Sequence, residues 1–281
     1  MVNKVAVIIL NYNSSDDCRK CVSFLKRQKE VDLELILIDN CSLDGEKVKA
    51  ICEDQSCTFI SSNENRGYNA GNNIGLRYAV NKGYKYALIV NPDMEFHQSD
   101  YVKKLVCVME SDEDVVLCGS DILGVDGLHQ NPWSFTTIWD DIPILCQALN
   151  IVKREKRRPY TKSGYCDILT GCCFALNLNF ISSIGFLDEN VFLYCEEAIL
   201  GKQVQNSYKK SFYLHEVQAI HRHIESTKGN FEKRYKIFWE SRWYYLKTYS
   251  GYNKFTLALI YLFRELYYFM KCIHIKIKGA K

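Results

Sequence analysis

Several features that would place the chain in a large class of proteins are missing from its sequence. No apolar run approaches the ~20 residues that a membrane-spanning helix needs; residues 255–263 come nearest and are stopped by Arg264 and Glu265. No secretory signal is visible, because the apolar residues 5–10 are too few and no cleavage pattern follows. The net charge of +3 is too small to indicate nucleic-acid binding. These absences favour a cytoplasmic globular protein that does not bind nucleic acid.

Proline is also scarce, with four residues, and no linker or internal repeat indicates a domain boundary.

Cysteine is plentiful, but the thirteen residues are odd in number and irregularly spaced. This favours reduced thiols that act as small buried hydrophobes. Cys18 and Cys21 form a C-x-x-C, which we attribute to chance spacing because a zinc site would need a second such pair.

What is present is an alternation of apolar runs and helical segments in the first half. The runs are apolar on both faces, which is typical of strands buried in a parallel sheet that helices cover. The sequence therefore predicts a doubly wound α/β domain with a mostly parallel sheet. Strands are expected at residues 5–10, 33–38, 86–90 and 115–118, and helices at 15–29, 72–82 and 100–110. The second half is less regular and ends in helices predicted over 231–249 and 255–278.

Polar clusters follow three of the predicted strands where each apolar run ends. In open parallel sheets, ligands bind just beyond the carboxyl ends of the strands. Asn and Asp are also frequent in turns for conformational reasons, so one cluster would carry little weight. Three clusters at successive strand ends predict a polar site along one rim of the sheet. They are Asn11-Tyr12-Asn13, Asp39-Asn40 and Asn91-Pro92-Asp93.

Residues 65–75 read N-R-G-Y-N-A-G-N-N-I-G. Gly67, Gly71 and Gly75 are four residues apart, so in a helix they would share one face and allow close packing. The spacing is not that of a dinucleotide-binding loop, and no G-K-[ST] follows. Two interpretations stay open: a tightly packed helix start, or asparagine side chains that meet a phosphate or sugar, since asparagine is a poor helix former. The asparagines are Asn65, Asn69, Asn72 and Asn73.

Three further positions carry side chains suited to metal binding or proton transfer. Asp93 can hold a divalent cation that bridges diphosphate oxygens, although N-P-D alone is usually a turn. Glu196 and Glu197 form either a solvated helix start or, in a cleft, a general base for an acceptor hydroxyl. His221 and His223 follow an extended stretch and would point to the same side of a strand. Imidazole suits Mn²⁺ better than Mg²⁺.

Together these motifs resemble glycosyltransferase family 2, which has the GT-A fold. They occur in the family's order and span about residues 5–247. The motifs are V-I-I-L-N-Y-N from residue 7, D-N-x-S-x-D-G from 39, N-x-G-Y-x-x-G-N-N-x-G from 65, N-P-D from 91, G-x-x-F from 171, L-D-E-x-x-F-L-Y-x-E-E from 187 and H-x-H-x-x-S from 221. Within the family, the chain is most similar to rhamnosyltransferase-like and galactofuranosyltransferase-like members that build bacterial surface polysaccharides.

The resemblance implies a role for each matching residue. Asp93 and His221 would bind Mn²⁺ or Mg²⁺, with His223 as the second choice for the imidazole. Glu197 would be the catalytic base, and Glu196 is the secondary candidate. The remaining matching residues would bind a dTDP- or UDP-linked sugar. Asn11, Tyr12 and Asn13 would contact the base and ribose, and Asp39 would accept a hydrogen bond from the pyrimidine N–H. The donor-binding set is Asn11, Tyr12, Asn13, Asp39, Asn65, Gly67, Asn72, Asn91 and Asp93.

The resemblance also implies a division of the chain. Residues 1–225 would form the catalytic domain, with a nucleotide-sugar-binding half at 1–125 and an acceptor and catalytic half at 126–225. Residues 226–281 would form C-terminal helices that either pack on this domain or lie, as a basic amphipathic segment, on an anionic membrane at the inner face of the plasma membrane.

The expected function is inverting, metal-dependent transfer of rhamnose or another hexose to a glycan or polyprenyl-diphosphate-linked acceptor. The family often continues E-D-x-D-L, whereas this chain has Ile199 in place of the second acid. That departure keeps a catalytically inactive nucleotide-sugar-binding subunit as one alternative. A sugar nucleotidyltransferase is the other, although such enzymes usually carry a Gly-rich basic loop after the first strand.

Overall fold

Three of the predicted apolar runs, at residues 5–10, 33–38 and 86–90, lie in the parallel part of a single sheet, and the fourth, at 115–118, lies beyond it in the same sheet. The protein is described by a computed structural model covering residues 4–142, 161–222 and 231–279, with side chains left out at 231 and 270–279. Among these residues the strand order is β3-β2-β1-β4-β8-β6-β9-β5, and β7 pairs with β9. The first four strands are β1 (Val5–Asn11), β2 (Leu33–Asp39), β3 (Thr58–Ser61) and β4 (Tyr86–Val90).

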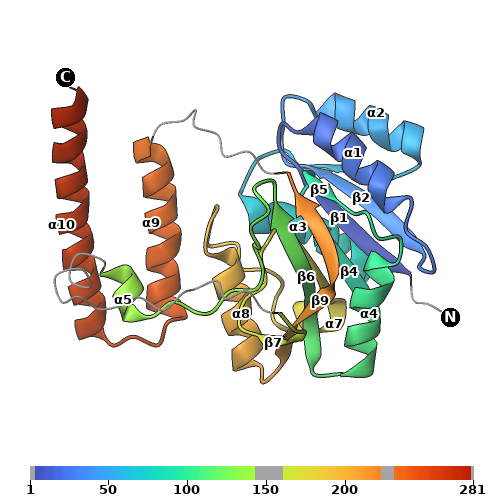
Figure 1. Ribbon diagram of the computed structural model, residues 1–281. Helices are drawn as coiled ribbons and strands as arrows, with labels where there is room; N and C mark the ends of the chain where they lie inside the picture. The colour runs from blue at the N-terminus through green and yellow to red at the C-terminus, as the bar shows by residue number, and fades with distance from the viewer. Residues whose placement is uncertain (1–3, 143–160, 223–230, 280–281) are drawn as a thin grey trace.

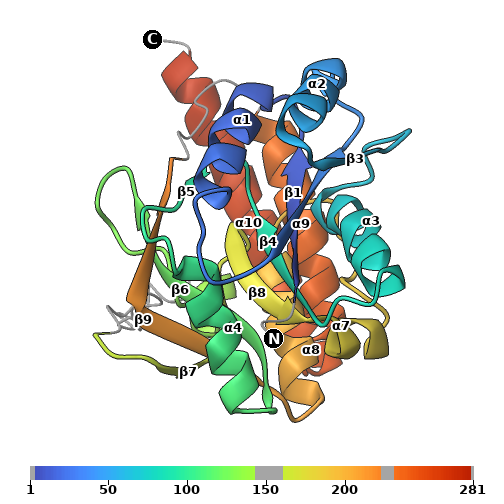
Figure 2. The same cartoon turned by 90° about the vertical axis from the view of Figure 1, so that its right-hand side faces the viewer.

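Strand β1 lies at the centre of the parallel part and shows why the sheet is covered on both faces. Its side chains alternate between two apolar layers, and all seven residues are buried. Helices α1 (Ser15–Leu25), α2 (Gly45–Gln55) and α4 (Tyr101–Ser111) contribute to one layer. Helices α3 (Tyr68–Asn81), α7 (Leu178–Ser183) and α8 (Glu196–Asn206) contribute to the other. The α/β expectation is therefore confirmed, and Figure 2 shows the helices on either side of the sheet.

Beyond β4 the sheet also contains antiparallel pairings. Strand β8 (Cys173–Asn177) runs antiparallel to both β4 and β6 (Val115–Gly124). Strand β9 (Lys210–His221) is parallel to β6 but antiparallel to β5 (Met94–Glu95) and β7 (Gly164–Cys166). An apolar run that is buried on both faces looks the same in either direction, so the sequence pattern could not show which strands reverse.

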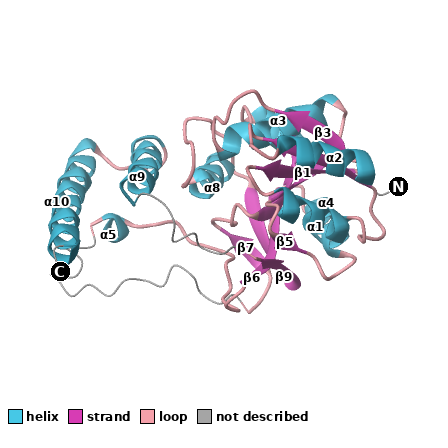
Figure 3. Ribbon diagram, turned by 90° about the horizontal axis from the view of Figure 1, so that it is seen from above, coloured by secondary structure: helices cyan, strands magenta, loops and turns pink. Residues whose placement is uncertain are grey.

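The C-terminal helices stand beside the sheet rather than on it. Helix α9 (Phe231–Thr248) and helix α10 (Lys254–Gly279) lie antiparallel, with Tyr235 stacked on Tyr268 and Trp243 in a tilted ring contact with Tyr261. Helix α8 lies between them and the sheet, and the short helix α5 (Ile138–Asp141) lies next to α10 (Figures 1 and 3). In the part of the chain that is described, no helix is long and apolar enough to cross a membrane.

Helix α9 is joined to the rest of the protein by specific contacts. The guanidinium of Arg242 makes two hydrogen bonds, of 2.8 and 2.7 Å, with the carboxylate of Asp141, and both side chains are more than 90% buried. A small apolar cluster surrounds this pair and includes Val191, Ile199 and Tyr245. The division at residue 225 stays a prediction, but α9 packs directly on the segment that carries Glu197.

The cysteines behave as predicted. Cys18 and Cys21 are buried on the inner face of α1, within the apolar layer that covers β1. Among the described residues the cysteines are free thiols, and no group of three or more His, Cys, Asp or Glu side chains is placed to hold a metal by itself.

Candidate functional site

The polar clusters at the strand ends meet at one rim of the sheet, as predicted. Strands β1 and β2 are paired so that Asn11 lies beside Asp39. The fully buried Asn11 amide lies 2.9 Å from Asp39 Oδ1, and its Nδ2 is also close to Ser42 and Asp44. This network fixes the loops after both strands. Asn11 therefore lies beneath the rim, with its side chain engaged by its neighbours.

A second network holds the loop before α3 against the segment before α8. Asn40 Nδ2 donates to Asn65 Oδ1 (3.1 Å), and the same oxygen accepts from the Gly67 N–H (2.9 Å). Gly67 has φ +107°, and a Cβ there would approach the carbonyl oxygen of Phe192 to 2.4 Å. Only glycine fits this position, because it tolerates the positive φ and the close approach together. The N–H of Tyr68 donates to the same Phe192 carbonyl (2.9 Å).

Above these networks lies an open cleft of about 770 Å³. One wall consists of strand-end residues, with Tyr12, Asn40, Asn91 and Asp93 among them. The opposite wall consists of Phe192, Leu193 and one face of α9. Three carboxylates and one lysine make up the charged lining among the described residues, namely Asp17, Asp93, Glu240 and Lys233. An anionic ligand such as a diphosphate would be repelled by this lining unless a cation accompanied it.

Asp93 and His221 meet at the rim, although 128 positions separate them in the sequence. Strand β5 follows Asp93 directly, and its Met94 is paired with His221 at the end of β9. The Nε2 of His221 lies 3.2 Å from Oδ1 of Asp93, and both side chains are mostly buried, at 12% and 21% exposure. The Nδ1 of His221 lies 2.8 Å from the carboxamide oxygen of Gln130. Since that oxygen can only accept, Nδ1 carries the proton and Nε2 faces Asp93 as a potential ligand.

This pair fits a divalent cation of the kind that the resemblance implies. Two adjacent ligands of an octahedral Mg²⁺ or Mn²⁺ lie roughly 3 Å apart, close to the observed 3.2 Å. Such ions commonly take one or two protein ligands and complete their shell with phosphate oxygens and water. Two protein ligands beside an acidic cleft are therefore sufficient for an ion that binds together with a diphosphate.

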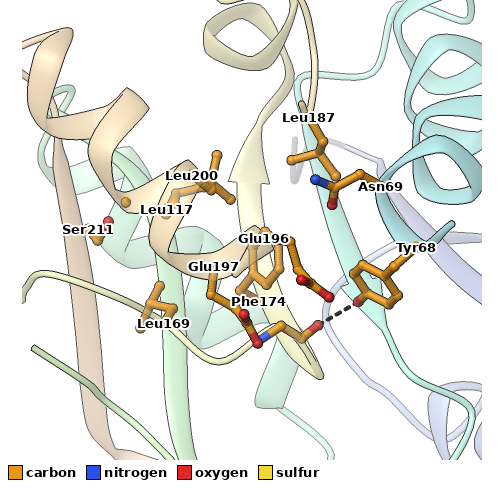
Figure 4. A pocket seen from close by; sticks show the side chains of 12 residues that line it. Tyr68, Asn69, Leu117, Leu169, Phe174, Leu187, Glu196, Glu197, Leu200 and Ser211 are labelled. Carbon is orange, nitrogen blue, oxygen red and sulfur yellow. Dashed lines mark hydrogen bonds between the residues drawn. The ribbon is translucent and has the colours of Figure 1, made fainter. Parts of the chain in front are cut away.

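Glu196 and Glu197 begin α8 and point into a narrow cavity that adjoins the cleft (Figure 4). The Oε1 of Glu197 accepts a hydrogen bond from the Gly171 N–H (3.2 Å). The hydroxyl of Tyr68 lies 2.6 Å from the Gly171 carbonyl oxygen and 3.1 Å from Oδ1 of Asn91. Tyr68 lines both the cavity and the cleft, so two hydrogen-bonded residues connect the carboxylates to the rim.

The environment of the two carboxylates disfavours their charged forms. Burial raises the pKa of Glu196 to about 8, and the neighbouring Glu197 charge adds to the shift. Burial also raises the pKa of Glu197, although the backbone N–H groups of Glu197 and Gly171 oppose it. The Oε2 of Glu196 has no hydrogen-bond partner among the described residues. Carboxylates with raised pKa values beside a cleft are suited to act as proton acceptors near neutral pH.

Four of the eight described non-glycine residues with positive φ lie in segments that flank the cleft. Tyr194 and Cys195, which lead into α8, both have positive φ, at 74° and 65°. Non-glycine residues rarely adopt this conformation, and such strain is concentrated at functional sites. Asn13 (57°) and Cys41 (60°), in the loops after β1 and β2, share it. The strained residues therefore flank the cleft.

The structure brings most of the predicted site residues to one place, but not all of them face the cleft. Tyr12, Asn65, Gly67, Asn91 and Asp93 line it. Asn13 is exposed and accepts the Leu43 N–H, whereas Asn11, Asp39 and Asn72 are buried. Their contacts with the donor stay predictions, and the geometry of the buried three favours supporting roles. His223 lies outside the described residues.

The asparagine-rich helix start is explained mainly by packing. Asn69 Nδ2 donates to the Asp188 carbonyl oxygen (2.7 Å). Asn73 donates to the Leu187 carbonyl oxygen and accepts its N–H, at 2.8 and 3.1 Å. Of the two interpretations, a tightly packed helix start is therefore confirmed for Asn69 and Asn73, because α3 uses these side chains to hold the segment that leads to Glu197.

Three residues of the site were missed at the sequence level. Tyr68 stands inside the quoted N-x-G-Y motif, so its position in that motif was an available signal. Gln130 lies in none of the motifs quoted above, and only the fold places it on His221. Lys233 is one of many C-terminal basic residues, and nothing in the sequence separates it from the others.

The comparisons with known proteins agree with this geometry. The sequence profile described as Glycosyl transferase family 2 matches residues 6–184. The chain is similar to the low-salt glycan biosynthesis hexosyltransferase Agl10 of Haloferax volcanii, with 25% identity over 258 residues that cover 90% of this chain and 78% of the relative. It is also similar to the dTDP-rhamnosyl transferase RfbF of Shigella flexneri, with 24% identity over 132 residues that cover 47% of this chain and 43% of the relative.

A solved structure extends the likeness to the whole fold. The crystal structure of GalNAc-T7 with UDP, GalNAc and Mn²⁺ matches with a TM-score of 0.61 and 15% identity. The match covers 99% of this chain, which spans 58% of the length of that structure. The likeness confirms the predicted GT-A arrangement.

Proposed function

Because this chain belongs to glycosyltransferase family 2, we propose that it is a metal-dependent, inverting hexosyltransferase that uses a nucleoside-diphosphate sugar. The observation that carries the proposal is the meeting of Asp93 and His221 at the rim of the cleft, 3.2 Å apart. The relatives named above, a hexosyltransferase of glycan biosynthesis and a dTDP-rhamnosyl transferase, support a hexose or rhamnose as the transferred sugar. The first of these relatives also supports a glycan as the acceptor.

The strand-end wall is the proposed donor site. Tyr12 is exposed beside the loops that Asn11 and Asp39 hold in place, which suits contact with a base and ribose. Asn65 and Asn91 offer amide groups toward the diphosphate and the sugar. Asp93 and His221 would hold Mn²⁺ or Mg²⁺, and the structure of GalNAc-T7 contains Mn²⁺ together with UDP. When bound, the ion supplies positive charge to the departing nucleoside diphosphate.

Glu197 is the proposed general base. Its Oε1 is held by the Gly171 N–H, which leaves the other oxygen to take a proton from the acceptor hydroxyl. As that proton leaves, the acceptor oxygen attacks the anomeric carbon from the side opposite the diphosphate. The bond to the diphosphate oxygen breaks as the new bond forms, so the anomeric configuration inverts. A base with a raised pKa is matched to proton transfer near neutral pH.

The position of Ile199 bears on the alternative of an inactive subunit. Ile199 is 1% exposed and packs in the apolar cluster with Val191 and Tyr245 of α9. The acid that many relatives carry here is therefore replaced by a contact that anchors α9. The inferred base, Glu197, is unaffected by this exchange. The family match offers no support for a sugar nucleotidyltransferase.

A screen of nucleotide sugars tests the proposal. The protein is incubated with Mn²⁺ and, in turn, dTDP-rhamnose and a set of UDP-hexoses, while thermal stability and release of the nucleoside diphosphate are measured. One donor should raise the melting temperature only when metal is present and should be hydrolysed or transferred slowly. NMR of the glycoside product would establish inversion. The absence of any metal-dependent donor effect would contradict the proposal.

Helix α10 supports a peripheral contact with an anionic membrane. Its described part leaves a run of apolar side chains exposed at helical spacing, which are Phe255, Leu262, Leu266 and Phe269. The sequence adds Lys271, Lys276, Lys278 and Lys281 close by. Flotation with vesicles of anionic and of neutral lipid is the test, and equal failure to bind both would contradict the contact.

A further inference from the structure

The wall of the cleft formed by α9 differs in chemistry from the strand-end wall. Lys233, Ile237 and Glu240 are spaced by four and three residues, so they share one face of the helix, and all three line the cleft. Phe192 and Leu193 continue this wall and remain 45% and 37% exposed. An apolar strip with a cation at one end and a carboxylate at the other therefore faces the proposed donor site.

The wall is held firmly in place. The hydroxyl of Ser241 donates to the Leu193 carbonyl oxygen (2.7 Å), and Tyr244 donates to Oδ2 of Asp188 (2.8 Å). Arg242 is fixed by its buried pair with Asp141. These contacts tie α9 to the segment that leads into Glu197, so the strip has a defined position relative to the proposed base.

The composition of the strip suits a neutral sugar ring. A pyranose presents an apolar C–H face, which packs on aromatic and aliphatic side chains, and an edge of hydroxyl groups, which hydrogen-bond to charged side chains. A phosphate group is a poorer match, because Glu240 and Asp17 line the same cleft and oppose the single favourable charge of Lys233. The charge balance thus favours an uncharged acceptor at this wall.

We propose that Phe192, Leu193 and the Lys233–Ile237–Glu240 face of α9 form the acceptor subsite, and that it binds a neutral pyranose. The proposal rests on the proposed transferase function. It places acceptor recognition on a C-terminal helix, beyond residues 6–184 that match the family profile. The sugar stacks on the apolar strip, between the donor wall that carries Asp93 and the segment that carries Glu197.

Saturation-transfer NMR with simple glycosides tests the proposal. The probes are methyl glycosides of glucose, galactose, mannose and N-acetylglucosamine, with methyl glucuronide as the anionic counterpart. Each is added to the full chain with the diamagnetic ion Mg²⁺ and UDP or dTDP, whichever the protein binds. At least one neutral glycoside should receive saturation at its C–H face, and the glucuronide should receive less. Stronger saturation of the glucuronide would overturn the proposal.

Variants locate the binding. Phe192→Ala, Ile237→Ala and Lys233→Ala should each weaken glycoside binding by about tenfold, the size expected for loss of one stacking or charged contact. Lys247→Ala is the matched control, because this lysine lies on the same helix but is exposed and does not line the cleft.

Calorimetry with the nucleoside diphosphate and Mn²⁺ separates the two proposals. Unchanged diphosphate affinity in the variants shows that they fold and that the donor wall is intact. Glycoside binding that survives all three substitutions would then overturn the acceptor subsite alone. A wild-type protein that binds no diphosphate with metal would instead contradict the proposed function.

Discussion

The two regions that meet at the cleft differ in how their polar groups are held. At the strand ends, the polar side chains form hydrogen bonds with one another or with backbone groups, and these bonds hold the loops in place. The side chains are Asn11, Asp39, Asn40 and Asn65. At the start of α8, Glu196 and Glu197 are half-buried with raised pKa values, and the residues before them have positive φ angles. The strand-end side chains therefore have hydrogen-bond partners, whereas the carboxylates at the start of α8 lie in surroundings that disfavour their charged forms.

This difference indicates a division of labour. A satisfied network holds a fixed shape, which suits recognition of a donor. A carboxylate that is costly to ionise is a better proton acceptor than a solvated one, because its raised pKa increases its basicity. Holding these carboxylates in such surroundings costs free energy, and the packing of α9 and α3 on the segment that leads into α8 offsets this cost. The predictions below perturb one region at a time, from the largest expected effect to the smallest.

The largest effect is expected from Glu197→Gln. The amide cannot accept the acceptor proton, so transfer should fall by roughly 10²–10⁴-fold, the range typical for loss of a general base. Donor binding, measured by calorimetry with Mn²⁺, should be unchanged because the strand-end region is untouched. Near-full turnover of this variant would show that Glu197 is not the base.

Arg242→Leu should lower the stability of the fold without acting directly on the proposed catalytic residues. It leaves the Asp141 carboxylate buried without its partner, which typically costs about 3–5 kcal/mol. Denaturant unfolding would measure this loss. Lys236→Ala is the control, because it breaks an exposed pair with Glu240 (3.8 Å) and should cost less than about 1 kcal/mol. Equal effects of the two substitutions would contradict the view that α9 is anchored by the buried pair.

Asp93→Ala should weaken metal-dependent donor binding by roughly 100-fold, because it removes one of two inferred ligands for the ion. Calorimetry with and without Mn²⁺ gives the comparison. Asp17→Ala is the matched control, since Asp17 lines the same cleft but forms its ion pair with Lys20, whereas Asp93 contacts His221. Unchanged affinity for the donor in Asp93→Ala would refute the metal-binding role.

Gln130→Leu should lower Mn²⁺ affinity in the presence of the nucleoside diphosphate by about 10–100-fold. The leucine cannot accept from Nδ1 of His221, so the ring loses the contact that orients Nε2 toward Asp93. Electron paramagnetic resonance of free Mn²⁺ is a direct measurement. His129→Ala controls for changes to the loop, because His129 contacts the buried Asp121 instead. The idea fails if both variants bind the ion equally well.

The smallest effect is expected from Glu196→Gln. In the wild type, transfer should decline as pH falls through the raised pKa of Glu197, because a protonated base cannot accept a proton. Glu196 has a pKa of about 8, raised in part by the Glu197 charge, so it is still neutral where Glu197 ionises. A neutral glutamine in its place should therefore leave the acidic limb of the pH–rate profile where it is. A limb that moves to lower pH would contradict this order of ionisation.

Local sequence determined much of the architecture. The apolar runs that became β1, β2 and β4 are continuous and bounded by Asn or Asp, so their burial and their polar ends followed from composition. The helix at residues 45–55 was not expected, because only Val48, Ile51 and Cys52 are buried on its inner face. Such a short apolar pattern does not stand out from a loop.

The site was predictable as a set of residues but not as a geometry. The pattern of Asn and Asp after successive strands predicted the rim, and the motifs identified Glu197 and His221. The sequence could not show that Asn11 and Asn72 are buried beneath the rim, because burial depends on which elements pack above them. Nor could it show that Gln130 reaches His221, since this contact joins residues 91 positions apart.

The chain by itself therefore determined the identities of the strands, the polar rim and the family, because these depend on short-range patterns of apolarity and residue type. Tertiary structure alone decided the reversal of β8, the meeting of Asp93 with His221 through the pairing of β5 and β9, and the use of α9 as a wall of the cleft. Each of these arises from long-range packing. The free energy of burying apolar surface depends on area rather than on sequence order, so it leaves no local signature.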